Sequence, residues 1–190
     1  GKTVGISNIV LGGADAGNYT LASTTATTSA DIAKASISAV TGITAQNRTY
    51  DGTTNASLNI GGAAFTGRIG NDALSVTSAS GAFADKNAGA AKSVAITGIT
   101  LGGADAGNYV LASDTSSTRA DIARAALIIA ADNASKIAGQ SIVLNGYSTR
   151  GLVAGDSVAS VSLASSGEAA SAAAGSHAIV ASAATGADLS

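Results

Sequence analysis

Apolar and small polar residues alternate with a period of two along most of the chain. Val4 and Ile6 follow this pattern near the start, and Leu58 and Ile60 follow it further on. A period of two is expected when one face of a strand lies against a core. Clusters of glycine, asparagine and aspartate interrupt the alternation about every 8 to 12 residues, which is the turn spacing of an antiparallel sandwich. The pattern therefore predicts an all-β fold.

The alternation slips by one residue at two places in the chain. It slips between Ile6 and Ile9 and again between Ile96 and Ile99, which predicts a β-bulge or tight bend at each place. The segments ADIAKAS and ADIARAA are compatible with a helical turn or with a strand, and helix has little other support. Further short strands are expected at 19–23, 37–40, 74–76 and 127–130.

The slips recur because the sequence itself repeats. The nonapeptide LGGADAGNY occurs at 11–19 and again at 101–109. Extended outward, residues 1–38 align over residues 91–128 without a gap and with 23 identities. An internal repeat with a period of 90 residues indicates tandem modules.

The likeness between the two copies ends near residue 126, where a different kind of sequence starts. We therefore expect three parts: the C-terminal part of a preceding repeat at 1–35, a complete repeat at 36–125, and another module at 126–190. Because Gly1 aligns with the interior of a repeat, we also expect an excerpt from a longer polypeptide whose export signal lies elsewhere.

The composition narrows the class of protein. Charged residues make up 12% of the chain, against about 25% in an average globular domain, and there is no cysteine. Glycine, alanine, serine and threonine take their place, which favours an extracellular repeat protein over a cytosolic enzyme. The net charge of −2 has no cluster of either sign, so we expect no nucleic-acid partner. The sequence contains neither a signal-peptide pattern nor an apolar run that could span a membrane.

Catalytic residue types are almost missing. His177 is the only histidine and Glu168 the only glutamate, and no G-x-S-x-G elbow occurs. The aspartates mostly stand in glycine-rich turns, which is their usual structural place. We predict that the protein is not an enzyme and holds no cofactor.

The repeated GGADAG segment has the residues of a tight turn. Its glycines allow positive φ values, and its aspartate and asparagine can cap turn amides. The same side chains are the main metal-ligand candidates: Asp15 and Asn18 in the first copy, and Asp105 and Asn108 in the second, to which Asp31 or Asp121 near the junctions could add oxygens. A calcium ion needs six to eight oxygens, so turn capping is the favoured interpretation and calcium binding the alternative.

Tyrosines mark the other two structural motifs. Tyr19 and Tyr109 follow the repeated turn, where each ring can enter a core and each hydroxyl can bond to upstream backbone, as in a tyrosine corner. Tyr50, Asp51 and Gly52 form the second motif, and the Asp-Gly pair predicts a type I′ or related hairpin turn.

These motifs stand in segments that resemble two known families. The strings RTYDGTTNASLN, GNDALSV and AFADKNAGAAKSVAITGITLGGADAGNYVLAS resemble the YDG repeat of large bacterial surface proteins related to filamentous haemagglutinin. The strings ALIIAADNASK, GLVAGDSV and AAAGSHAIVASAATGAD are similar to the MBG module, a mostly bacterial immunoglobulin-like domain. The resemblance implies tandem immunoglobulin-like antiparallel β-sandwich modules. That family would still need its closing strand where the chain ends at Ser190.

The resemblance also implies a function. Proteins of this kind are secreted or surface-attached adhesins of Gram-negative bacteria, and an outer-membrane secretion partner commonly exports them. The modules would form a stalk, with neighbouring repeats of the same polypeptide as their partners, that projects a distal binding region. The alternative is a module that binds matrix polysaccharide or host glycan, although four Tyr and two Phe give few aromatic platforms for a sugar.

Overall fold

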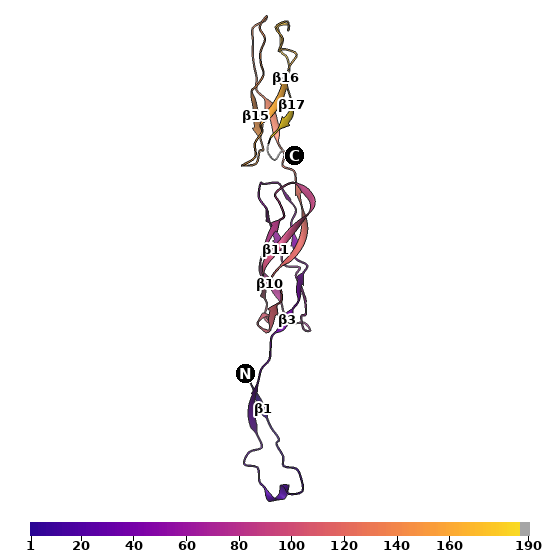
Figure 1. Ribbon diagram of the computed structural model, residues 1–190, viewed down its shortest axis with the longest axis vertical. Helices are drawn as coiled ribbons and strands as arrows, with labels where there is room; N and C mark the ends of the chain where they lie inside the picture. The colour runs from indigo at the N-terminus through magenta and orange to yellow at the C-terminus, as the bar shows by residue number, and fades with distance from the viewer. Residues whose placement is uncertain (187–190) are drawn as a thin grey trace.

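A computed structural model describes residues 1–186 and shows an elongated, almost entirely β molecule (Figure 1). Three parts follow one another along its long axis: an N-terminal two-stranded ribbon, a central sandwich, and a C-terminal part with two small sheets. Short segments connect the parts. The all-β prediction of immunoglobulin-like tandem sandwich modules is confirmed.

The strands are short at the start of each part and long in the middle of the chain. In order they are β1 (Lys2–Ile6), β2 (Ala26–Ala30), β3 (Ala35–Ile37), β4 (Ala39–Thr41), β5 (Thr44–Ala45), β6 (Arg48–Thr49), β7 (Asn55–Ala56), β8 (Leu58–Asn59), β9 (Ala64–Thr66), β10 (Ser75–Phe83), β11 (Gly89–Gly102), β12 (Tyr109–Leu111), β13 (Ser116–Ala123), β14 (Ile128–Ala131), β15 (Tyr147–Arg150), β16 (Ser160–Ala164) and β17 (Val180–Thr185). Two single 3-10 turns, η1 (Ala16–Asn18) and η2 (Ala106–Asn108), are the only helical elements in the described part of the chain. None of its helices is long and apolar enough to cross a membrane.

The central part holds the apolar core. Its main sheet has the order β6-β13-β11-β10-β7, and the short ribbons β12-β3, β4-β9 and β5-β8 complete the sandwich. The inward positions of the alternating strands carry β-branched residues such as Ile37, Val94 and Ile96, which are fully buried. Two pairings, β12 with β3 and β13 with β6, are parallel, so the sandwich is not purely antiparallel.

The C-terminal part has a much thinner interior. Strand β14 pairs with β15 and β16 pairs with β17, both antiparallel. Every fully buried apolar residue of the described chain lies between Ile37 and Ile122, so none belongs to this part. Alanine, serine and glycine supply most of its positions, and their small side chains bury little area. The expected lack of a closing strand concerns the end of the chain at 187–190, which lies outside the described residues.

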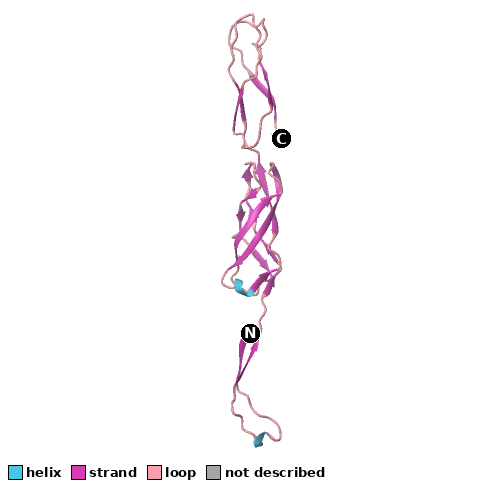
Figure 2. Cartoon of the chain, turned by 60° about the vertical axis from the view of Figure 1, so that its left-hand side comes forward, coloured by secondary structure: helices cyan, strands magenta, loops and turns pink. Residues whose placement is uncertain are grey.

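The sequence repeat is also a structural repeat. Strand β1 pairs with β2 from Lys2 opposite Ala30 to Ile6 opposite Ala26. Strand β11 pairs with β13 in the same antiparallel register 90 positions later, from Lys92 opposite Ala120 onward. The turns η1 and η2 close each ribbon at the same end (Figure 2). The N-terminal ribbon is therefore a copy of the β11-β13 hairpin without the strands that pack on it in the central part.

Most of the predicted local structure is present, with one difference. The phase slips occur at residues with positive φ, Asn8 at 58° and Gly98 at 65°, and the β10-β11 register shifts there. The segment ADIARAA begins as strand. The strand expected at 19–23 is wrong: only its counterpart β12 forms, because β12 pairs with β3 and the first copy has no such partner within the described chain.

Candidate functional site at the junction between modules

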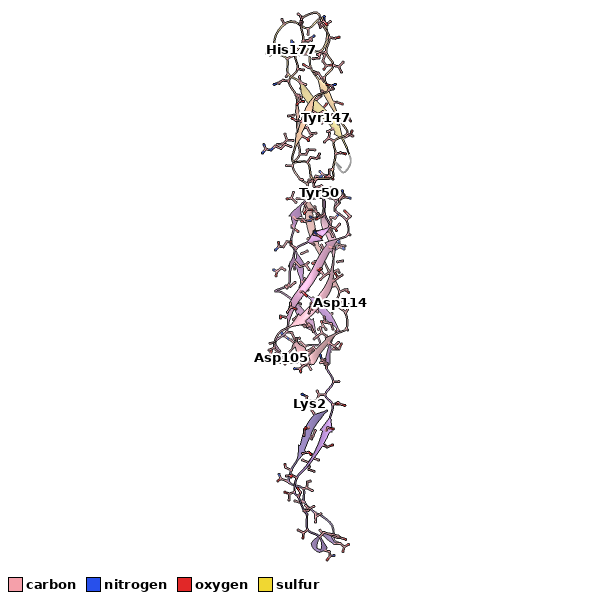
Figure 3. The ribbon with its side chains drawn as sticks, turned by 90° about the vertical axis from the view of Figure 1, so that its left-hand side faces the viewer. Lys2, Tyr50, Asp105, Asp114, Tyr147 and His177 are labelled. Carbon is pink, nitrogen blue, oxygen red and sulfur yellow. The ribbon has the colours of Figure 1, made fainter. Side chains whose placement is uncertain are left out.

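The Tyr50-Asp51-Gly52 turn lies at the end of the central part that faces the C-terminal part (Figure 3). Strand β6 precedes it and pairs with β13, whereas β7 follows it and pairs with β10. Since β6 and β7 are opposite edges of the five-stranded sheet, the turn crosses the end of the sheet and does not close a hairpin. The predicted hairpin is therefore wrong, because the flanking strands prefer partners that are distant in sequence.

Asp51 fixes the shape of this turn. One of its carboxylate oxygens accepts the backbone N–H and the hydroxyl of Thr53, each at 2.9 Å, and it also pairs with Arg48. Arg48 donates in addition to the carbonyl of Thr53 and stacks over the ring of Phe83, 5.1 Å from its centroid. The bonds to the Thr53 amide and to the Arg48 guanidinium lower the pKa of Asp51 to about 2. These contacts of Asp51 and Arg48 fix the backbone of the turn and so hold Tyr50 in place.

Gly52 brings the backbone of the turn close to the next part. Its φ is +79°, a conformation that favours glycine, and a Cβ at this position would lie 3.2 Å from a methyl group of Val153. The Asp-Gly pair thus shapes the turn and permits the close approach across the junction.

Tyr50 makes the hydrogen bond that joins the two parts. Its hydroxyl donates to Oδ1 of Asp156 at 3.0 Å, and the ammonium of Lys86 lies 3.7 Å from the same oxygen. The Asp156 side chain is only 5% exposed, while that of Lys86 is 36% exposed. Desolvation and the bond to Asp156 raise the pKa of Tyr50, and Lys86 partly opposes this rise. A nearly buried carboxylate of one part is thereby satisfied by donors from the other.

A small cavity accompanies these contacts. It has a volume of about 220 Å³, and its lining includes Tyr50, Asn87, Arg124 and Leu152. Small-molecule sites generally enclose about 300 to 1,000 Å³, so this cavity is below their usual size. The sequence did not point to Asp156 as the partner of Tyr50 and Lys86, because these contacts join residues 70 or more positions apart.

A second polar cluster lies at the opposite end of the central part, where Asp105 is labelled in Figure 3. Tyr109 is 4% exposed, its hydroxyl donates to Oδ2 of Asp72 at 2.6 Å, and it accepts the N–H of Ile69 at 2.9 Å. The bond to Asp72 and burial raise the pKa of Tyr109. Asp105 accepts the N–H of Ala73 at 2.7 Å. Tyr109 thus packs in the core and bonds to upstream backbone, and Asp105 ties its loop to the neighbouring one.

In the first copy of the repeat, no such cluster encloses the equivalent tyrosine within the described residues. Tyr19 is 72% exposed, so the expectation that its ring enters a core is wrong for this chain. The counterparts of Ile69 and Asp72, 90 positions earlier, would precede Gly1. Neither Asp15 nor Asp105 caps its own 3-10 turn with its side chain, so the turn-capping interpretation is wrong for both aspartates, and Asp105 instead accepts the amide of Ala73 in the neighbouring loop.

The calcium candidates are dispersed in the structure. Within residues 1–186 no group of three or more His, Cys, Asp or Glu side chains is placed to hold a metal ion. In the second copy, Asp105 already binds the amide of Ala73, and Asn108 ends the turn η2. In the first copy, Asp15 precedes the turn η1 and Asn18 ends it. Calcium binding at either loop stays a prediction without support from this geometry.

The only histidine does meet a serine. Nδ1 of His177 lies 3.0 Å from Oγ of Ser166, and Nε2 lies 3.0 Å from the carbonyl oxygen of Ala173. A carbonyl only accepts, so Nε2 carries the proton and Nδ1 accepts from Ser166. A triad would instead orient the histidine with a carboxylate, a place that Ala173 takes here. The pair links two loops of the C-terminal part.

Comparison with known families assigns both modules. The YDG domain family matches residues 33–117, and the MBG domain family of the YGX type matches residues 127–188. No curated protein and no solved structure matches the chain. The two domains together mark an adhesin-like repeat region of a bacterial surface protein, and such domains are typical of extracellular bacterial proteins.

We predict that Tyr109→Phe destabilises the central part and that Tyr19→Phe does not. The first change removes the donor to Asp72 and leaves the partly buried N–H of Ile69 without its acceptor. We expect the melting temperature to fall by about 5 °C for Tyr109→Phe and to stay unchanged for Tyr19→Phe. Calorimetry of the two variants measures this, and equal effects would contradict the assignment.

We predict a pH-dependent contribution from Asp51. Because its pKa is lower in the folded chain than its ordinary 3.8, its stabilisation is complete above that value and is lost as the pH falls through about 2. Asp51→Asn should therefore lower the urea midpoint at pH 7, and the difference from wild type should shrink between pH 4 and pH 2. Asp85, whose pKa is lowered by its bonds to Lys92 and Asn87, should behave in the same direction. A difference that is constant with pH would disprove this role.

We predict that the rate of trypsin cleavage after Arg124 reports how often the junction between the central and C-terminal parts opens. Arg124 lies in the segment between β13 and β14, and Lys34 takes the same place 90 positions earlier, after β2. Cleavage requires the segment to open, so Tyr50→Phe should speed cleavage after Arg124 by about tenfold and leave cleavage after Lys34 unchanged. Tyr147→Phe is the control, since its hydroxyl bonds within the C-terminal part, to Val158.

Proposed function

Because the chain carries a YDG domain followed by an MBG domain, we propose that it is a spacer segment in the stalk of a secreted or surface-attached bacterial adhesin. In this proposal the modules place a distal binding region away from the cell envelope of a Gram-negative bacterium. An outer-membrane secretion partner exports the parent protein. The modules themselves catalyse no reaction and hold no cofactor.

The contact between Tyr50 and Asp156 is the main support for this function. A flexible connection would need no side-chain bonds between the modules, whereas here a hydroxyl and an ammonium from one module meet a nearly buried carboxylate of the next. Such bonds to a charged group are stronger than neutral ones and restrict the angle between the modules. A spacer that must keep its length needs this restriction.

The proportions of the molecule support the same function. The parts lie end to end along one axis in every view. The central module has a core of its own, so an array can grow by adding modules that contact only their neighbours. We propose that 1–35 is the C-terminal part of a preceding YDG repeat, 36–125 a complete repeat, and 126–190 the MBG module.

We predict that spin labels across the junction will report a narrow distance distribution. The chain has no cysteine, so labels at Ser117→Cys and Ser148→Cys, both exposed, are the only ones attached. Tyr50→Phe should broaden the distribution, and Tyr147→Phe should not. A broad distribution in the wild-type chain would oppose the spacer function. Tight, saturable binding in a glycan array would instead favour the alternative, a glycan-binding module.

A further inference from the structure

Both modules contain the same turn, packed against the start of the module, although their sequences belong to different families. Gly67 in the YDG domain has a φ of +100°, and a Cβ there would lie 2.4 Å from the carbonyl oxygen of Ser36. Gly151 in the MBG domain has a φ of +88°, and its Cβ would lie 2.2 Å from the carbonyl oxygen of Ala126. Each glycine therefore packs against the first residue of its own module.

The same turns end in equivalent aspartates. Asp72 follows Gly67 by five positions, and Asp156 follows Gly151 by five. The N–H of Asp72 donates to the carbonyl of Ile69 at 3.2 Å, and the N–H of Asp156 donates to that of Val153 at 3.1 Å. Asp156 is the residue that accepts the hydroxyl of Tyr50 across the junction, so Asp72 is its structural counterpart in the YDG domain.

The apolar neighbour is equivalent too. Val153 lies against Gly52 of the preceding module and is half-buried there. Ile69 takes the same position in the YDG domain and is 62% exposed. The MBG domain receives the Tyr-Asp-Gly turn at Val153. At the equivalent position the YDG domain therefore presents a large, exposed apolar side chain, Ile69.

The connecting segments have the same length. Ala30 is six residues before Ser36, and its counterpart Ala120 is six residues before Ala126. In both cases the earlier residue lies opposite the equivalent lysine, Lys2 or Lys92, and the later one packs on the glycine of the next module. A YDG repeat directly before Ser36 would thus be joined to the central module by a segment of the same length as the one that joins the YDG and MBG domains.

The two ends of the YDG domain are also complementary in charge. The end that carries Tyr50 presents Lys86 and Arg124 to the next module. The opposite end holds the carboxylates of Asp72 and Asp105 around Tyr109. Stacking head to tail brings the cationic end of one repeat to the acidic end of the next.

We propose that the Asp72 turn is the docking site for the Tyr-Asp-Gly turn of a YDG repeat directly before Ser36. In this arrangement Asp72 accepts the tyrosine hydroxyl and meets the lysine of that repeat, and Ile69 covers its glycine. Tyr109 occupies Oδ2 of Asp72, and a carboxylate can accept at both oxygens, so the second tyrosine has an acceptor. This inference rests on the proposed stacking of repeats and extends it from one junction to the array.

The test uses the full chain with residues 36–125 present twice, so that 1–125 is followed by 36–190. Tyr50 of the first copy then precedes Asp72 of the second copy. Labels at Ser117→Cys in both copies report the new junction, and labels at Ser117→Cys of the second copy with Ser148→Cys report the junction between the YDG and MBG domains. The variant is Asp72→Asn in the second copy, and the matched control is Asp72→Asn in the first copy. Both replace one carboxylate oxygen by an NH2 group and leave a single side-chain acceptor, which is enough for Tyr109 alone but not for two tyrosines, and only the second copy follows a Tyr-Asp-Gly turn.

We expect a narrow distribution at the new junction in the unmodified duplicated chain. Asp72→Asn in the second copy should lower the ratio of docked to undocked junctions by about tenfold, and the control should leave it unchanged. Tyr50→Phe in the first copy, which cannot affect Tyr109, should reproduce the loss. Equal effects of the two Asp72→Asn variants, or a broad new junction beside a narrow one at the MBG domain, would overturn the docking site and leave the spacer function standing. Broad distributions at both junctions would overturn both.

Discussion

The burial of one carboxylate controls how the modules are joined. Asp156 loses nearly all contact with water, and an ionised carboxylate in such a place must have donors close by. Tyr50 and Lys86 are two such donors, and both belong to the other module. Separating the modules would return all three groups to water, whereas bending them without separation would leave a charge buried and unsatisfied. The docked geometry is favoured for this reason over intermediate ones.

The residues that give the YDG domain its name divide the work of this contact. Tyr50 reaches the neighbouring module, Asp51 holds the turn through Thr53 and Arg48, and Gly52 lets the backbone approach Val153. The motif thus connects the modules and contributes to the core only at its margin, where Tyr50 packs against the cluster that contains Phe83 and Val94. The acidic loop at the other end, with Tyr109 at its centre, is built from the repeated GGADAGNY segment.

Periodicity in the sequence was enough to predict the β class, the phase slips at Asn8 and Gly98, and the repeat whose two copies share one register. These features depend on neighbours in the chain. The Asp51-Gly52 pair was wrongly interpreted as a hairpin, because local turn preference does not specify which strands pair, and here the flanking strands are the two edges of the sheet. Tyr19 and Tyr109 end identical nonapeptides, yet one is exposed and one buried, since burial depends on residues near 69 and 72, which within the described residues accompany the second copy alone. The junction was missed for the same reason.

The parallel pairing of β3 with β12 has a mechanical consequence. Strand β3 is where the chain enters the central module, and its hydrogen bonds to β12 run across the strand direction. Tension applied along the molecule pulls β3 parallel to its own length, so these bonds bear the load together and cannot peel apart one after another. Rupture then requires several bonds to break in a single event, and the lifetime of the module under load is set by its unfolding rate. Such a geometry resists shear at the point where an anchored filament would transmit drag from moving fluid.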